Sequence, residues 1–239
     1  MSSTLNFCPV LEEMYNTRTT VGASGKPFTM TSGLSTINNL LVLRRILLEK
    51  KPMRTLEVGM ACGGSALTFA ASHNDNGFDP QCQHVAIDGF QRSGFDDVGR
   101  LQLARAGLDG FVSVRESLSS FELASLAEKG ERFGVIYIDG SHQFEDVFCD
   151  FYFTMSILEV DGLILFDDSS DPEVAKVVRF IQSNLRHAFK HVSTAKFRGL
   201  TGLENVKFRI AENLHKTQLT IFQKTSANIG RGGMRLNSF

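Results

Sequence analysis

The chain has 239 residues, of which 42% are hydrophobic and 21% are charged, and its formal net charge is −1. This composition is that of an ordinary globular protein with a large core. We expect one domain, although the length also allows two. The near-neutral charge argues against general electrostatic binding to nucleic acid or to a membrane surface. No apolar run approaches the ~18 residues of a transmembrane helix, and we see no signal-peptide pattern at the N-terminus.

The cysteines indicate a reducing compartment. Four are present, and none of them forms a C-x-x-C pair: Cys8, Cys62, Cys82 and Cys149. Because they lie mostly among apolar residues, we interpret them as reduced thiols of a cytosolic protein. The predicted location is therefore cytoplasmic.

Residues 1–33 are polar and contain several glycines, with one short helix predicted around Val10 to Tyr15. Two interpretations of this segment are open: a disordered N-terminal arm, or a mobile lid that orders over a ligand. From Leu34 to Lys50 the leucines and isoleucines recur at helical spacing, which predicts an amphipathic helix. Pro52 ends it.

Residues 54–65 read R-T-L-E-V-G-M-A-C-G-G-S and predict a strand, a tight turn and the start of a helix. Glycine permits positive φ and lets a ligand approach the backbone. The unpaired N–H groups at the start of the helix point into the same hollow. The spacing is not the G-x-G-x-x-G of a dinucleotide site. An ordinary strand-to-helix turn remains the alternative interpretation.

Further apolar runs predict strands with helices between them. These strands are His84–Ile87, Phe111–Val114, Phe133–Ile138 and Val160–Phe166. After residue 190 the pattern changes, and His191–Phe197 and Gln218–Gln223 alternate as strands, joined by a partly helical segment at 202–216. Six or seven strands of this kind predict a doubly wound α/β sheet. We expect a single domain over 34–225 and a loose tail over 226–239.

Four of the predicted strands end in carboxylates: Glu57, Asp88, Asp139, and Asp167 with Asp168. In an open parallel sheet, ligands bind beyond the carboxyl ends of the strands, so these acids should gather at one edge. Carboxylates held close together repel each other, and a cation removes that conflict. Asp139, Asp167 and Asp168 are therefore a candidate Mg²⁺ site. The alternative is that Asp167 and Asp168 only cap a turn.

The motif E-x-G-x-x-x-G-G-S at residues 57–65 resembles the first motif of the class I S-adenosylmethionine (SAM) dependent methyltransferases. Y-I-D-G-S-H and L-F-D-D, at 137–142 and 165–168, are similar to the metal-dependent O-methyltransferases of that class. The catechol and caffeoyl-CoA enzymes have an Asp-Asn pair where this chain has Asp167 and Asp168. The D-G-x-H and D-D forms are closer to bacterial enzymes that methylate sugars and other hydroxyls of secondary metabolites. The resemblance covers about Leu34 to Leu185.

The resemblance implies a mostly parallel, seven-stranded Rossmann-like sheet with helices on both faces. It also implies SAM as cofactor, with Mg²⁺ or another divalent cation. It assigns the methionine portion of SAM to the first motif, the ribose to Asp88, and the adenine ring to Ser117 and Leu118. In the first motif the implied residues are Glu57, Gly59, Gly63, Gly64 and Ser65. Capping roles for Asp88 and Ser117 are the alternatives.

His142 lies three residues after Asp139, the place of the catalytic lysine in the catechol enzymes. The resemblance thus implies catalytic roles for Asp139 and His142. Imidazole titrates near neutrality, so it can accept a proton from a hydroxyl that a metal has acidified. The alternative is a histidine in the first turn of a helix that hydrogen-bonds a nearby acid.

The expected function is methyl transfer from SAM to a hydroxyl of a small molecule. A sugar or a secondary metabolite fits the motifs, and the phenylalanine-rich helices also allow an aromatic acceptor. The exposed N-terminal arm would allow a homodimer. Two other functions stay open. One is an NAD-dependent oxidoreductase on a similar sheet, against which the missing G-x-G-x-x-G argues. The other is a SAM-binding module without turnover.

Overall fold

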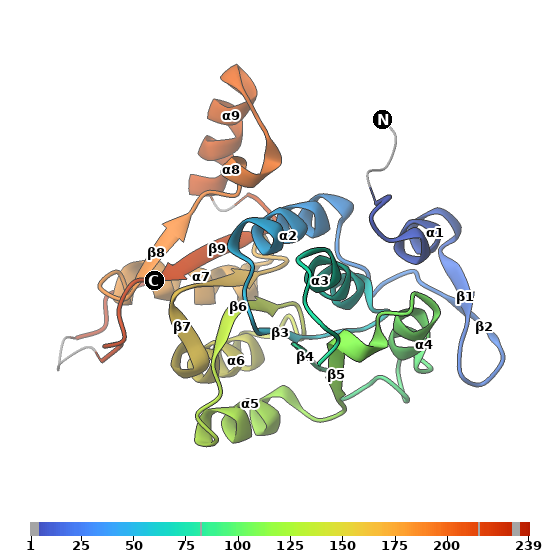
Figure 1. The fold of residues 1–239 in the computed structure, drawn as a ribbon. Coiled ribbons are helices and arrows are strands. Elements are labelled where there is room, and N and C mark those ends of the chain that lie inside the picture. Colours follow the sequence, from blue (N-terminus) through green and yellow to red (C-terminus); the bar gives the residue numbers. More distant parts are fainter. Residues whose placement is uncertain (1–4, 82, 215, 231–234) are drawn as a thin grey trace. The chain divides into compact units, whose positions relative to one another are not determined.

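A computed structural model describes residues 5–81, 83–214, 216–230 and 235–239 (Figure 1). The chain divides into two compact units, residues 1–122 and 123–239, and each is described by itself. The single domain predicted for 34–225 is thus described in two parts. Cys82 lies outside the described residues. Cys8, Cys62 and Cys149 are free thiols, as expected.

The first unit contains three parallel strands in the order β5-β4-β3. They are β3 (Thr55–Val58), β4 (His84–Ile87) and β5 (Val112–Arg115). The helices are α2 (Ile37–Lys50), α3 (Gly64–Asp75) and α4 (Val98–Arg105), followed by a 3₁₀ turn (Asp109–Phe111). Strands β3 and β4 are buried along their whole length, and this includes the polar side chains of Thr55, Glu57 and His84. Helix α5 (Ser119–Glu128) leads from the first unit into the second.

The N-terminal segment is packed into the first unit. It forms α1 (Pro9–Thr17) and a hairpin of β1 (Thr19–Val21) and β2 (Pro27–Thr29), beside α4 in Figure 1. Leu5, Leu11 and Met14 are buried in one cluster with Leu67 of α3 and Leu103 of α4. The short predicted helix is confirmed. The packing of residues 5–30 differs from the loose arm expected from the polar composition, because the few apolar side chains find partners far along the chain. A lid function remains a prediction.

The second unit contains four strands in the order β6-β7-β9-β8. They are β6 (Phe133–Ile138), β7 (Leu158–Phe166), β8 (Phe189–Val192) and β9 (Thr220–Lys224). Strand β7 is parallel to β6, whereas β9 is antiparallel to both β7 and β8. Strands β6, β7 and β8 therefore run in one direction, and their carboxyl ends lie at one edge. The helices are α6 (Phe144–Ile157), α7 (Pro172–Asn184), α8 (Ala195–Arg198) and α9 (Gly202–Asn213).

The predicted fold class is confirmed: the chain has an α/β fold with a seven-stranded, mixed and mostly parallel sheet. Among the described helices, none is long and apolar enough to cross a membrane.

One predicted strand is shorter than expected. Strand β8 ends at Val192 instead of Phe197, and α8 begins at Ala195. The reason is hydrogen bonding to a side chain of α9: the backbone N–H and the hydroxyl of Thr194 both donate to Glu212 Oε1, at 2.7 and 2.6 Å. Such side-chain bonds compete with a strand ladder.

A buried polar network joins β3, β4 and α3 in the first unit. The Thr55 hydroxyl lies 2.9 Å from His73 Nε2 and 2.9 Å from His84 Nδ1. His84 Nε2 in turn lies 3.2 Å from Glu57 Oε1, and all four side chains are buried. Burial, and then the neighbouring His84, lowers the pKa of His73 to about 3. The fold therefore holds His73 neutral at physiological pH.

The free energy of unfolding should fall as the pH is lowered from about 6.5 towards 3. In this window unfolded His73 binds a proton while folded His73 does not, so protons favour the unfolded chain. This group alone adds a slope of up to about 1.4 kcal/mol per pH unit. Urea denaturation across this pH range measures the slope. His73→Asn should flatten it, and His187→Asn, at an exposed histidine, should not. Equal slopes in all three proteins would contradict the prediction.

Candidate functional site

The turn between β3 and α3 depends on glycine. Gly59 and Gly63 have φ of 87° and 88°, a conformation that other residues rarely adopt. A Cβ on Gly63 would also lie 3.0 Å from the Cα of Gly99 in α4. Gly64 and Ser65 follow as the first residues of α3. The turn therefore brings the N–H groups at the start of α3 close to any ligand that the turn holds.

Asp88, which follows β4, braces this turn. Its Oδ2 accepts hydrogen bonds from the N–H groups of Met60 and Ala61, at 3.1 and 2.7 Å, and from Gln91 Nε2 at 2.9 Å. Its Oδ1 accepts one from the N–H of Phe90 at 2.8 Å. A carboxylate oxygen has about two acceptor positions, so Oδ1 retains one for a ligand. The ribose role of Asp88 stays a prediction, and the structure adds a second role in holding the turn.

The loops that follow β4 and β5 lie against each other. A Cβ on Gly89 would be 3.2 Å from the carbonyl oxygen of Ser117 and 3.6 Å from the backbone nitrogen of Leu118. The same loops and the start of α5 leave apolar side chains in solvent, with Phe90 59%, Leu118 52% and Phe121, in α5, 70% exposed. Exposed apolar groups beside a braced carboxylate are typical of a ligand site. Their position agrees with the predicted adenine role of Ser117 and Leu118, which remains untested.

Glu57 lies differently from the other predicted residues of the cofactor site. Its carboxylate is fully buried and faces His84 in the network described above. The position gives no support to a direct contact with the methionine portion of SAM. Sequence spacing alone could not show this, because the orientation of Glu57 depends on a histidine from the neighbouring strand.

The N-terminal segment reaches the glycine turn directly. The N–H of Cys62 donates to the carbonyl oxygen of Gly33 at 3.2 Å, and the Cys62 thiol donates to that of Ser32 at 3.8 Å. Burial, and then the nearby Asp88, raises the pKa of Cys62 to about 11. Cys62 is therefore a protonated structural thiol and not a nucleophile.

In the second unit, an acidic cluster forms where β6 and β7 end. The backbone N–H of Asp167 donates to the carbonyl oxygen of Ile138 at 3.0 Å, which holds the two strand ends together. Asp139, His142 and Asp168 each place one potential ligand atom within 4.8 Å of the others. The structure thus brings together both predicted catalytic residues, Asp139 and His142, and two of the three predicted metal ligands, Asp139 and Asp168.

His142 lies between two carboxylates. Its Nδ1 is 2.9 Å from Asp171 Oδ2, and its Nε2 is 3.3 Å from Asp168 Oδ2. Asp171 is not among the site residues predicted from the sequence. It occupies the N-cap position before α7, but its side chain makes no capping hydrogen bond. Residues 167–171 read D-D-S-S-D, and this run of acids is the sequence feature that could have indicated a third acid here.

Asp167 is buried and already has partners. It accepts a short hydrogen bond from the Tyr137 hydroxyl and another from the N–H of Asp168 at 2.9 Å. It lies outside the group formed by Asp139, His142 and Asp168, but it lines a cavity of about 10 Å³ with Asp139 and His142. That volume is about the room that one water or one ion needs. The role of Asp167 as a metal ligand remains a prediction.

Asp168 is held in an unfavourable state. Its φ is +46°, a region that non-glycine residues rarely occupy. Burial raises the pKa of its carboxyl; His142 opposes this shift and Asp171 adds to it. A divalent cation would favour the charged form. The carboxylate oxygens are donors that fit Mg²⁺ or Mn²⁺, whereas an imidazole ligand is typical of softer divalent metals.

Comparisons with known proteins agree with this description. Residues 56–169 match the model of a family described as a methyltransferase domain. An O-methyltransferase from Bacillus cereus in complex with SAH has 17% identity and a TM-score of 0.63, over 91% of this chain and 90% of that chain. The O-methyltransferase TomG from Streptomyces achromogenes, in complex with SAM, has 15% identity and a TM-score of 0.61, over 95% and 91%. No curated protein sequence gives a significant match. Residues 56–169 are therefore similar to a methyltransferase domain, and the chain has the Rossmann-like fold of these O-methyltransferase structures.

Proposed function

We propose that this protein is a SAM-dependent O-methyltransferase that acts on a hydroxyl of a small molecule with the help of a divalent cation. The observation that carries the proposal is the Asp139, His142 and Asp168 cluster, in a chain whose residues 56–169 are also similar to a methyltransferase domain. A divalent cation held by these residues would make a bound hydroxyl more acidic and therefore easier to methylate. The acceptor proposed is a sugar or a secondary metabolite, aromatic acceptors included.

The first unit would bind the cofactor, whose chemistry, when bound, is the supply of a sulfonium methyl group. Gly59, Gly63 and the start of α3 give backbone donors for the methionine portion. Oδ1 of Asp88 accepts from the ribose. The backbone of Ser117 and the exposed side chain of Leu118 border the adenine ring. Support comes from the two O-methyltransferase structures of the same fold, one in complex with SAH and the other with SAM.

The second unit would hold the cation through Asp139 and Asp168, with Asp167 as the further predicted ligand. When bound, the cation supplies a Lewis acid that makes an acceptor hydroxyl more acidic. The strained backbone of Asp168 fixes its carboxylate in place before any ligand arrives. Holding the metal ligands in place in advance raises the rate of a reaction that depends on the alignment of its reacting atoms.

His142 is proposed as the base. With the proton on Nδ1 donated to Asp171, Nε2 keeps its lone pair on the side of Asp168. Nε2 then takes the proton of the acceptor hydroxyl, and Asp171 stabilises the imidazolium. The same Nε2 lies within reach of the cluster and could instead be a metal ligand, which the third experiment below separates. A homodimer and a cytoplasmic location remain predictions from the sequence.

Asp88→Ala should weaken SAM binding by roughly 1–3 kcal/mol, about ten- to a hundredfold, because charged hydrogen bonds to the ribose are lost and the turn loses its brace. Isothermal titration calorimetry with SAM measures this. Asp79→Ala, at an exposed acid of the same unit, should bind SAM as the wild type does. NADH should not compete with SAM. Unchanged SAM affinity in Asp88→Ala would remove the ribose assignment, and tight NADH binding would favour an oxidoreductase.

Chelation should stop methyl transfer, and added Mg²⁺ should restore it. Release of SAH in the presence of a panel of hydroxylated small molecules measures the turnover. Asp168→Asn should lower Mg²⁺ affinity by about tenfold or more, because a charged ligand is lost. Asp161→Asn is a matched control, since Asp161 also has positive φ, at 66°, and is exposed. Turnover that neither chelator nor Asp168→Asn affects would refute the metal half of the proposal.

His142→Gln should lower turnover by about a hundredfold or more if His142 is the base, with SAM and Mg²⁺ affinities unchanged. If His142 is a ligand, Mg²⁺ affinity should fall together with turnover. Calorimetric Mg²⁺ titration and SAH release, measured on the same variant, distinguish the two roles. His187→Gln serves as the control for the loss of an exposed histidine. Full turnover in His142→Gln would exclude both roles.

A further inference from the structure

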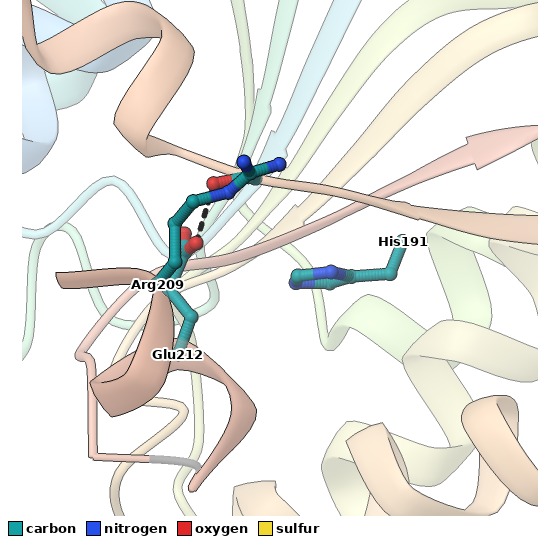
Figure 2. A pocket seen from close by; sticks show the side chains of 4 residues that line it. His191, Arg209 and Glu212 are labelled. Atoms are coloured by element: carbon teal, nitrogen blue, oxygen red, sulfur yellow. Dashed lines mark hydrogen bonds between the residues drawn. The ribbon is translucent and has the colours of Figure 1, made fainter. Parts of the chain in front are cut away.

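The second unit contains a polar cavity that the reaction proposed above does not use. It has a volume of about 390 Å³ and is lined by His191, Ser193, Arg209 and Glu212 (Figure 2). His191 belongs to β8, Ser193 follows that strand, and the other two belong to α9. A cavity of this size holds a small molecule or a large part of one.

The cavity lies at the edge of the sheet where the acidic cluster forms. Phe166, at the end of β7, pairs with Thr220, and Val192, at the end of β8, pairs with the next residue of β9, Ile221. Strands β7 and β8 flank β9 and end at almost the same level. Neighbouring strands are about 4.8 Å apart, so the two ends are roughly 10 Å apart. One small molecule can therefore reach from Asp168 to the cavity.

Glu212 is occupied by its own chain. It accepts hydrogen bonds from the Ser193 hydroxyl and from the N–H and hydroxyl of Thr194, and it is buried. The charge of Arg198 also interacts with Glu212 and with Asp167. Glu212 therefore works as a connector between α9 and the loop after β8, and both of its carboxylate oxygens already accept hydrogen bonds.

Arg209 has no such partner. It lies three residues before Glu212 on α9 and is exposed, and among the described residues its guanidinium forms no ion pair or hydrogen bond. In Figure 2 the imidazole of His191 points towards the side of the cavity where Arg209 and Glu212 lie. Burial lowers the pKa of His191, opposed by Glu212, so at neutral pH it is a neutral hydrogen-bonding group. Arg209 and His191 are therefore the lining residues that can still bind a ligand, and Arg209 is the charged one.

We propose that this cavity binds an acidic group of the methyl acceptor, a carboxylate or a phosphate, with Arg209 as its ion-pair partner. A guanidinium offers a planar pair of donors that matches both groups. The inference rests on the proposed function, because it takes the ligand of the cavity to be the methyl acceptor. It narrows the acceptor to hydroxylated molecules that carry a negative charge.

The test compares anionic probes with neutral counterparts of the same shape, in the presence of SAH so that no turnover is needed. The carboxylate pair is 3,4-dihydroxybenzoate and 3,4-dihydroxybenzamide, and the phosphate pair is glucose 6-phosphate and glucose. At least one anionic probe should bind about tenfold or more tightly than its counterpart, because a charged hydrogen bond is gained. Arg209→Gln should abolish this preference and leave the neutral probes unaffected, and Arg209→Lys should restore part of it.

Lys207→Gln is the matched control, since Lys207 is an exposed cation of α9 that does not line the cavity, and it should keep the preference. Equal binding of anionic and neutral probes, or a preference that persists in Arg209→Gln, would overturn the inference. Titration of SAM with the same proteins tests the cofactor site separately. Failure of the wild type to bind SAM would contradict the proposed function. Normal SAM binding without a preference for the anionic probes would contradict only the role proposed for the cavity.

Discussion

The cofactor half of this protein depends on one buried carboxylate. Asp88 accepts the N–H groups of Met60 and Ala61 in the glycine turn and that of Phe90 in the next loop. Buried N–H groups without an acceptor are costly, so the shape of the turn depends on this carboxylate. Gly63, pressed against Gly99, then closes the turn from the other side. The backbone donors offered to a ligand result from these two constraints acting together.

The acidic residues that follow strands have different roles in this molecule. The hydrogen-bond donors that each carboxylate accepts from indicate which role it has. Asp88 and Asp167 are buried and accept hydrogen bonds from their own chain. Glu212 does the same from a helix. Asp168, by contrast, is half-buried, has a raised pKa and faces His142. Asp88 and Asp167 therefore support the fold in addition to the ligand roles proposed for them, whereas Asp168, whose charged form is disfavoured, is mainly available for a ligand.

The sequence was sufficient where structure is local. Continuous apolar runs predicted β3 and β6, and the glycine spacing located the turn before α3. It was insufficient where the partner is distant. Thr194 ends its strand because of Glu212, eighteen residues later, and Asp171 turns from its helix towards His142. The cavity around Arg209 is likewise formed by residues from two separate elements, and no periodicity or motif in the sequence indicates that these residues lie close together.

The packing of the N-terminal segment has a consequence for biosynthesis. Leu11 of α1 is buried in a cluster that includes Leu103 of α4, and the ribosome makes these residues far apart in time. At roughly 5–20 residues per second, the first helix waits about 5–20 seconds before its partner exists. During that interval its apolar side chains are exposed in the nascent chain. The order of translation therefore leaves these side chains accessible to chaperones for that interval, although Leu11, Met14 and Tyr15 are buried in the finished protein.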